Sequence, residues 1–183
     1  MTAFFGTSFI VSKRIGKNPN VLPKDDSAYG LIGRYFKLTL VFLFIYTLLI
    51  FFFPHADYEG FSINFLETIY FKYIGITLML FSLLWVLIAQ FQMKNSWRIG
   101  IDEDLKTDLI TTGLFKYSRN PVFLGILLSL IGMLLTIPTF IALSFLIIAN
   151  ILIQTQIRLE EEFLLKQHDE VYLQYKAKVR RFL

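Results

Sequence analysis

The chain has 183 residues, of which 55% are hydrophobic and only 17% are charged, and its formal net charge at pH 7 is +4. Soluble domains carry roughly 25% charged residues, so this composition indicates an integral membrane protein of one domain. The chain contains no cysteine, which excludes disulfides, thiolate metal sites and a cysteine nucleophile. Its basic residues flank apolar runs, a placement that argues against nucleic-acid binding.

Two uncharged runs in the first half of the chain predict membrane helices. Leu38–Pro54 has 17 residues and would reach about 25 Å as a helix, which suits a slightly short span. Tyr73–Met93 has 21 residues, or about 31 Å. Residues 38–93 therefore predict two spans. They follow a cytoplasmic segment, residues 1–37, that we expect to be a loop ending in a short helix.

Residues 120–157 contain no charged side chain over 38 positions. A single helix of that length would measure about 57 Å, nearly twice the thickness of the hydrocarbon core. Pro138 lies near the centre, and an interior proline removes a hydrogen bond and clashes with the preceding turn. We therefore expect a tight hairpin of two short helices, Pro121–Ile137 and Thr139–Ile157.

Polar segments flank this hairpin on both sides. Residues 94–119 form a connector, in which the adjacent acids of residues 102–104 are typical of a solvated loop, so we expect no metal site. Residues 158–183 predict an amphipathic helix that begins with acids and ends with bases, the order that the helix dipole favours. Its apolar stripe consists of Leu159, Phe163, His168, Tyr172, Tyr175 and Val179.

The basic residues set the expected orientation. With four spans, 17 of the 18 Lys and Arg residues fall on one side of the membrane and only Lys72 on the other. The positive-inside rule then places both termini in the cytoplasm of a protein of the cell inner membrane or its equivalent. The predicted fold is an all-α integral membrane domain with about four transmembrane helices, a tight C-terminal hairpin and a cytoplasmic amphipathic C-terminal helix.

The first candidate site residues lie where the connector enters the hairpin, at Gly113, Tyr117, Arg119, Asn120 and Pro121. Asn120 suits a helix N-cap because its side-chain oxygen can accept from an unpaired backbone N–H. Pro121 suits the first helical position, where its missing N–H costs nothing. The pattern predicts a cationic, aromatic helix mouth that could hold a charged small molecule.

The other end of the hairpin carries Arg158, Glu160 and Glu161. A tight hairpin returns the chain to the same face of the membrane, so connectivity alone places these residues close to Arg119 and Asn120. The sequence thus predicts a cluster of both charges beside an apolar cleft.

Two motifs at these positions resemble a known family. The segment Gly113–Gly125 resembles the first signature of the isoprenylcysteine carboxyl methyltransferases, and Arg158–Leu164, followed by Tyr172 and Tyr175, resembles the second. Phospholipid N-methyltransferases have a similar pattern. The resemblance covers approximately residues 70–183 and implies a membrane methyltransferase.

The resemblance also implies S-adenosylmethionine as methyl donor, bound at the cytoplasmic face between the hairpin and the C-terminal helix. Tyr117 or Phe115 would hold its sulfonium by cation–π attraction. Arg119 or the N–H groups at the helix start would hold its carboxylate, and Glu161 its ammonium or ribose hydroxyls. The implied cofactor-binding residues are Gly113, Tyr117, Arg119, Asn120, Pro121 and Glu161.

The implied acceptor is a lipid or lipid-like molecule that enters from the bilayer. Asn120 stands where the family commonly has histidine, and asparagine cannot act as a base at neutral pH. His168-Asp169 stands where phenylalanine-glycine is common. A carboxylate acceptor needs no base and would pair with Arg158, whereas an amine or hydroxyl acceptor would need Glu160 as the base.

Two other functions are compatible with a small membrane protein of this kind. Sterol reductases that use NADPH share a similar C-terminal pattern, although they are much longer and have more spans. A non-enzymatic four-span scaffold is the other alternative. Ion-coupled transport is disfavoured because transporters usually carry ionisable groups inside the membrane and the predicted spans have none.

Overall fold

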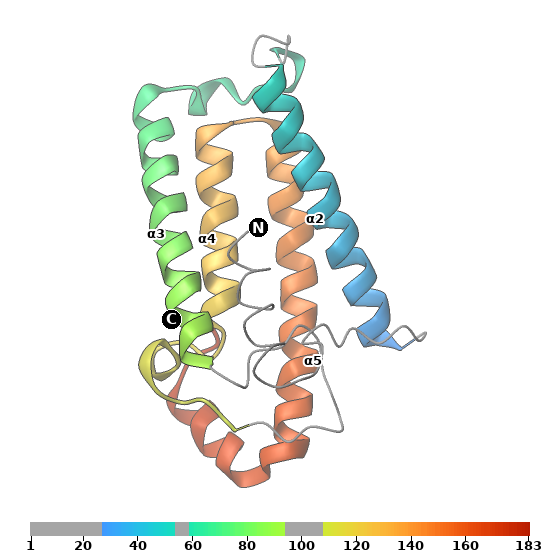
Figure 1. Cartoon of the computed structure of the whole chain (residues 1–183), viewed down its shortest axis with the longest axis vertical. Coiled ribbons are helices and arrows are strands. Elements are labelled where there is room, and N and C mark those ends of the chain that lie inside the picture. The colour runs from blue at the N-terminus through green and yellow to red at the C-terminus, as the bar shows by residue number, and fades with distance from the viewer. Residues whose placement is uncertain (1–26, 54–58, 94–107) are drawn as a thin grey trace.

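The computed structural model describes residues 27–53, 59–93 and 108–183, which form a bundle of helices (Figure 1). The helices are α2 (Ala28–Phe52), α3 (Ile69–Met93), α4 (Pro121–Thr136) and α5 (Phe140–Lys178), with short 3-10 turns η1 (Glu59–Phe61), η2 (Asn64–Leu66) and η4 (Gly113–Lys116). The turns η1 and η2 and the α4–α5 turn lie at one end of the bundle, and η4 and the last part of α5 at the other (Figure 1). The predicted loop before α2 and the acids of residues 102–104 fall outside the described residues.

The described residues contain helices, turns and one isolated β-bridge, between Ser62 and Thr139, so the all-α prediction is confirmed for this part of the chain. Among them, α2, α3 and α5 are long and apolar enough to cross a membrane. Helix α4 is apolar but has only 16 residues, about 24 Å. These helices identify a membrane protein, while the count of four spans stays a prediction.

The predicted hairpin is also present, because α4 and α5 are separated by a turn that contains Pro138. Thr139 caps α5: its hydroxyl accepts from the N–H of Ala142 at 3.1 Å and lies 2.6 Å from the hydroxyl of Tyr46 in α2. The carbonyl of Pro138 accepts from the N–H of Ile63 at 2.7 Å. These bonds fix the turn against both α2 and the loop before α3.

The predicted start of the first helix at Leu38 was wrong, because α2 already begins at Ala28, while the start of the membrane span within it stays a prediction. The side chain of Ser27 accepts from the N–H of Gly30 at 3.1 Å and so caps the helix at this earlier point. The residues between this cap and Leu38 continue the helix instead of forming a separate short one.

The predicted boundary between Ile157 and Arg158 was also wrong, because α5 passes through it without a break. Charged side chains do not interrupt a helical backbone, so a change in polarity is no boundary signal. The 39 residues of α5 would reach about 58 Å, and only the charge-free part through Ile157 suits the hydrocarbon core. The backbone bends instead at Asp169 (φ 43°, ψ −119°), and the following residues turn back toward the bundle (Figure 1).

Small residues allow α3 and α4 to approach closely. A Cβ on Gly75 would lie 2.5 Å from the carbonyl oxygen of Gly132, and a Cβ on Gly132 would lie 2.7 Å from that of Gly75. Two turns further along α3, Ser82 is fully buried next to Gly125 of α4. Contacts of this kind stabilise helix pairs in lipid, where burial of apolar side chains gives no advantage.

We predict that Gly75→Ala lowers the thermal midpoint of the protein in detergent. The added methyl group would meet backbone atoms of α4 that cannot rotate away, and overpacking of this kind costs about 1–3 kcal/mol. Gly60→Ala is the matched control, since a Cβ at Gly60 meets nothing within 4 Å. Equal midpoints for the two variants would contradict the close α3–α4 contact.

Candidate functional site

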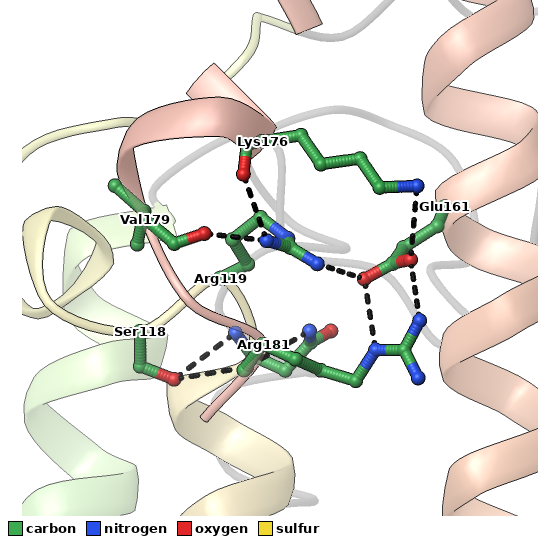
Figure 2. Close-up of polar contacts among 7 residues, drawn as sticks. Ser118, Arg119, Glu161, Lys176, Val179 and Arg181 are labelled. Carbon is green, nitrogen blue, oxygen red and sulfur yellow. Dashed lines mark hydrogen bonds and ion pairs between the residues drawn. The ribbon is translucent and has the colours of Figure 1, made fainter. Parts of the chain in front are cut away.

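The segments that carry the predicted motifs meet at the end of the bundle that holds η4. The first motif begins in the loop of residues 108–120 and continues into α4, and the part of α5 beyond Ile157 carries the second. Helix α2 reaches the same region, where the hydroxyl of Tyr29 donates to the carbonyl of Leu159 at 3.3 Å. Figure 2 shows polar contacts between the loop before α4 and the residues from Glu161 to the end of the chain.

Glu161 lies at the centre of these contacts, with its side chain only 7% exposed. One carboxylate oxygen accepts from a terminal nitrogen of Arg119 at 2.8 Å and from Nε of Arg181 at 3.1 Å. The other accepts from Nη2 of Arg181 at 2.8 Å and lies 3.6 Å from Nζ of Lys176 (Figure 2). The structure thus brings Arg119 and Glu161 together, as connectivity predicts. We call Arg119, Glu161, Lys176 and Arg181 the ion cluster.

Electrostatics keep the carboxyl of Glu161 ionised. Burial alone would raise its pKa, but hydrogen bonds from Arg181 and Arg119 and the charges of both guanidinium groups lower the pKa to about 2. Beside it, Tyr172 is 1% exposed, and burial together with the charge of Glu161 raises the pKa of Tyr172 to about 12. Because of this raised pKa, the phenol of Tyr172 is protonated at neutral pH and cannot serve as a base. Glu161 and Tyr172 both lie beyond the charge-free part of α5.

Residues Val179–Arg181, here called the C-terminal strap, are tied to the start of α4 through main-chain groups. The backbone N–H of Arg119 donates to the carbonyl of Arg180 at 3.0 Å. A terminal nitrogen of the Arg119 side chain donates to the carbonyl of Val179 and, at 3.2 Å, to that of Lys176. Arg119 therefore joins three separate segments, namely the loop before α4, the middle of α5 and the strap.

Asn120 does not make the predicted N-cap, although it immediately precedes α4. Its amide nitrogen donates instead to the carbonyl of Arg181 at 3.2 Å, and the buried hydroxyl of Ser118 donates to the same carbonyl at 3.4 Å. Asn120 therefore links the start of α4 to the strap through its amide nitrogen, and its oxygen makes no cap bond. Pro121 does take the first helical position, and its carbonyl accepts from the indole N–H of Trp85 at 3.0 Å.

Gly113 is required by the shape of the loop. Its φ of 64° lies in the left-handed region that favours glycine. The side chain of Gln92 lies 2.4 Å from the position of a Cβ on Gly113, and its oxygen accepts from the N–H of Leu114 at 2.8 Å. On the other side of η4, the hydroxyl of Tyr175 donates to the carbonyl of Phe115 at 2.6 Å. These contacts hold η4 between α3 and the end of α5.

Six of the eight predicted site residues lie outside the ion cluster: Gly113, Asn120 and Pro121, described above, and Arg158, Glu160 and Tyr117. Arg158 is exposed and donates to the carbonyl of Gln154 in its own helix at 2.9 Å. Glu160 accepts from the side chain of Gln156 at 2.9 Å, one turn earlier. Tyr117 follows η4 and is 64% exposed, so its ring is open to a ligand.

Sequence reasoning missed Lys176 and Arg181 as partners of Glu161. The bases at the end of the chain were interpreted as complements of the helix dipole, which was the only signal that they gave. Arg181 is 20 positions from Glu161, which in an unbroken helix would separate them by about 30 Å. Only the bend at Asp169 brings the two side chains together.

Comparison with known proteins identifies a family. The family model described as phospholipid methyltransferase matches residues 70–170, which is more than half of the 183-residue chain. The matched range contains Arg119 and Glu161 and ends before the strap. The curated proteins and the solved structures yield no match to the chain.

We predict that Glu161→Gln destabilises the protein at pH 7, because it leaves the buried guanidinium of Arg119 without its counter-ion. Removing one partner of a buried ion pair costs about 3–5 kcal/mol. Glu162→Gln, which changes an exposed neighbour, is the matched control. The measurement is the thermal midpoint of each variant in detergent.

The same variants give a test of pH dependence. A carboxyl whose pKa falls on folding from 4.5 to about 2 contributes stability that is complete above about pH 4.5. That contribution is lost as the pH falls toward 2. The midpoint of the wild type should therefore decline over this range more steeply than that of Glu161→Gln. Parallel curves would contradict the assigned ion pairs.

Proposed function

The chain belongs to the phospholipid methyltransferase family, and from this we propose that it transfers a methyl group from S-adenosylmethionine to a lipid or lipid-like acceptor. The observation that carries the proposal is the ion cluster at one end of an apolar helix bundle. It joins residues of both predicted motifs, namely Arg119 of the first and Glu161 of the second. In the proposed topology this end faces the cytoplasm, together with both termini.

The residues present fit a methyl donor that carries a sulfonium, an ammonium and a carboxylate. S-adenosylmethionine supplies an electrophilic methyl group on a positively charged sulfonium. Tyr117 offers an exposed aromatic ring for cation–π attraction to that charge. Glu161 is ionised, and because its Oε2 accepts only one hydrogen bond among the described residues, it could accept another from an ammonium or ribose hydroxyl.

The parts of the site differ in how they would contribute. Asn120 and Arg119 hold the strap against the start of α4, so their proposed role is to shape the binding site. Gly113 and Pro121 place the loop and the first turn of α4. Most of the rate enhancement is then expected from positioning the acceptor and excluding water, because methyl transfer is a direct displacement.

The acceptor decides whether a proton must be removed. A carboxylate is already ionised at neutral pH and needs a cation to orient it, for which the exposed guanidinium of Arg158 is the candidate. An amine or hydroxyl must lose a proton, and the candidate base is then Glu160, one position from Glu161. Asn120 can fill neither role, because its amide does not ionise.

We predict that purified protein binds S-adenosylmethionine and transfers its labelled methyl group to a component of a membrane lipid extract. Binding is measured by calorimetric titration in detergent, with NADPH as the comparison ligand. Label should appear in an organic-soluble product. Binding of NADPH without binding of S-adenosylmethionine would favour a reductase and contradict the proposal.

Glu160→Gln then separates the acceptor classes. It should reduce transfer to an amine or hydroxyl acceptor by roughly 100-fold or more, the usual contribution of a general base, and leave transfer to a carboxylate nearly unchanged. Glu162→Gln removes the neighbouring exposed charge and serves as the control. Full activity of Glu160→Gln on an amine or hydroxyl acceptor would remove Glu160 from the catalytic residues.

A further inference from the structure

The ion cluster carries more positive than negative charge. Arg119, Lys176 and Arg181 all approach the single carboxylate of Glu161, and these are their only ion pairs within the described part of the chain. Two positive charges therefore have no counter-ion there. An excess of this size in a partly buried cluster favours the binding of an anion.

The donors of Arg119 are largely used within the protein. Its side chain is 8% exposed, and its terminal nitrogens donate to Glu161 and to the carbonyls of Lys176 and Val179. Its Nε is buried and has no hydrogen-bond partner among the described residues. A buried donor without an acceptor is costly, so the cluster retains an unsatisfied N–H beside its excess positive charge.

Arg181 and Lys176 retain donors that face outward. Arg181 uses Nε and Nη2 on Glu161, while its Nη1 has no hydrogen-bond partner among the described residues, and its side chain is 32% exposed. Lys176 is 45% exposed and lies at the longer distance of 3.6 Å from Glu161. Both approach the same oxygen of Glu161, so one ligand group can reach both. Figure 2 shows the two side chains extending toward Glu161 from the strap and from the end of α5.

We propose that Arg181 and Lys176 form a binding site for an oxyanion at the rim of the ion cluster, with the buried Nε of Arg119 behind them. The proposal rests on the proposed function and adds to it the group that recognises the negative charge of a bound molecule. That charge is either the carboxylate of the methyl donor or the phosphate of a lipid acceptor. In both cases planar and tetrahedral oxyanions suit a guanidinium and an ammonium that share one oxygen partner.

This proposal differs from the role that the sequence predicts for Arg119, which stays a prediction. Its guanidinium is committed to Glu161 and the strap, so displacing it would break three contacts inside the protein. Arg181 and Lys176 can accept a second anion without leaving Glu161. The negative charge of the ligand would offset the excess positive charge of the cluster. It would not have to replace Glu161.

The first test compares S-adenosylmethionine with its decarboxylated form, which differs only in lacking the carboxylate. Full-length protein in detergent is titrated with each. If the site holds the donor's carboxylate, Lys176→Gln and Arg181→Gln should each weaken binding of S-adenosylmethionine by roughly tenfold, the effect of losing one charge-assisted bond. Binding of the decarboxylated form should change little.

The second test addresses the lipid source of the anion. Native mass spectrometry compares binding of phosphatidic acid with binding of diacylglycerol, which lacks the phosphate. Selective loss of phosphatidic acid binding in Lys176→Gln and Arg181→Gln would support the site with a lipid phosphate as its ligand.

The matched controls are Lys178→Gln and Arg180→Gln, which remove exposed charges next to the two test positions. If the test variants bind S-adenosylmethionine and phosphatidic acid as tightly as these controls do, the proposed oxyanion site is overturned. Lys176 does not hold the strap through its side chain, so Lys176→Gln keeps the test valid even if Arg181→Gln folds poorly. A wild type that binds no S-adenosylmethionine would reject the proposed function separately.

Discussion

The arrangement of this end of the protein depends on the ion pairs of Glu161. A carboxylate that is almost fully buried binds a guanidinium from the loop before α4 and another from the strap. It therefore joins the same segments that the main-chain bonds of Arg119, Asn120 and Tyr175 connect. A buried charge requires such partners, because desolvation without them costs several kcal/mol. The loop, the middle of α5 and the strap are consequently held as one unit.

The rest of the fold makes these ion pairs possible. The small-residue contact between Gly75 and Gly132 holds α4 close to α3, and the turn at Pro138 returns the chain to the end where it started. The bend at Asp169 then reverses the last part of α5. A positive φ is unfavourable for aspartate by roughly 1–2 kcal/mol, so the contacts of the strap must outweigh that cost. The contacts between helices and the bend at Asp169 together position the residues of the ion cluster.

Sequence alone predicted the features that follow from composition and chain continuity. Charge-free runs identified the apolar helices, Pro138 divided the hairpin, and a closed hairpin implied that Arg119 lies near Glu161. The reversal at Asp169 was not predicted, although aspartate is one of the few side chains that adopt a positive φ and stands where the resembled family commonly has glycine. The contact with Arg181 was missed for that reason, and the side chain of Asn120 was assigned to a cap because its competitor on the strap was unknown.

The central claim is that the methyl donor binds beside the ion cluster, and photochemical labelling tests it most directly. Purified protein is irradiated with methyl-labelled S-adenosylmethionine, and the modified peptides are identified by mass spectrometry. The account predicts label in the loop of residues 108–120 or in α5 beyond Ile157. At the opposite end of the bundle, a cavity of about 250 Å³ is lined by residues that include Glu67, Lys72 and Thr136. Label confined to that cavity would contradict the account.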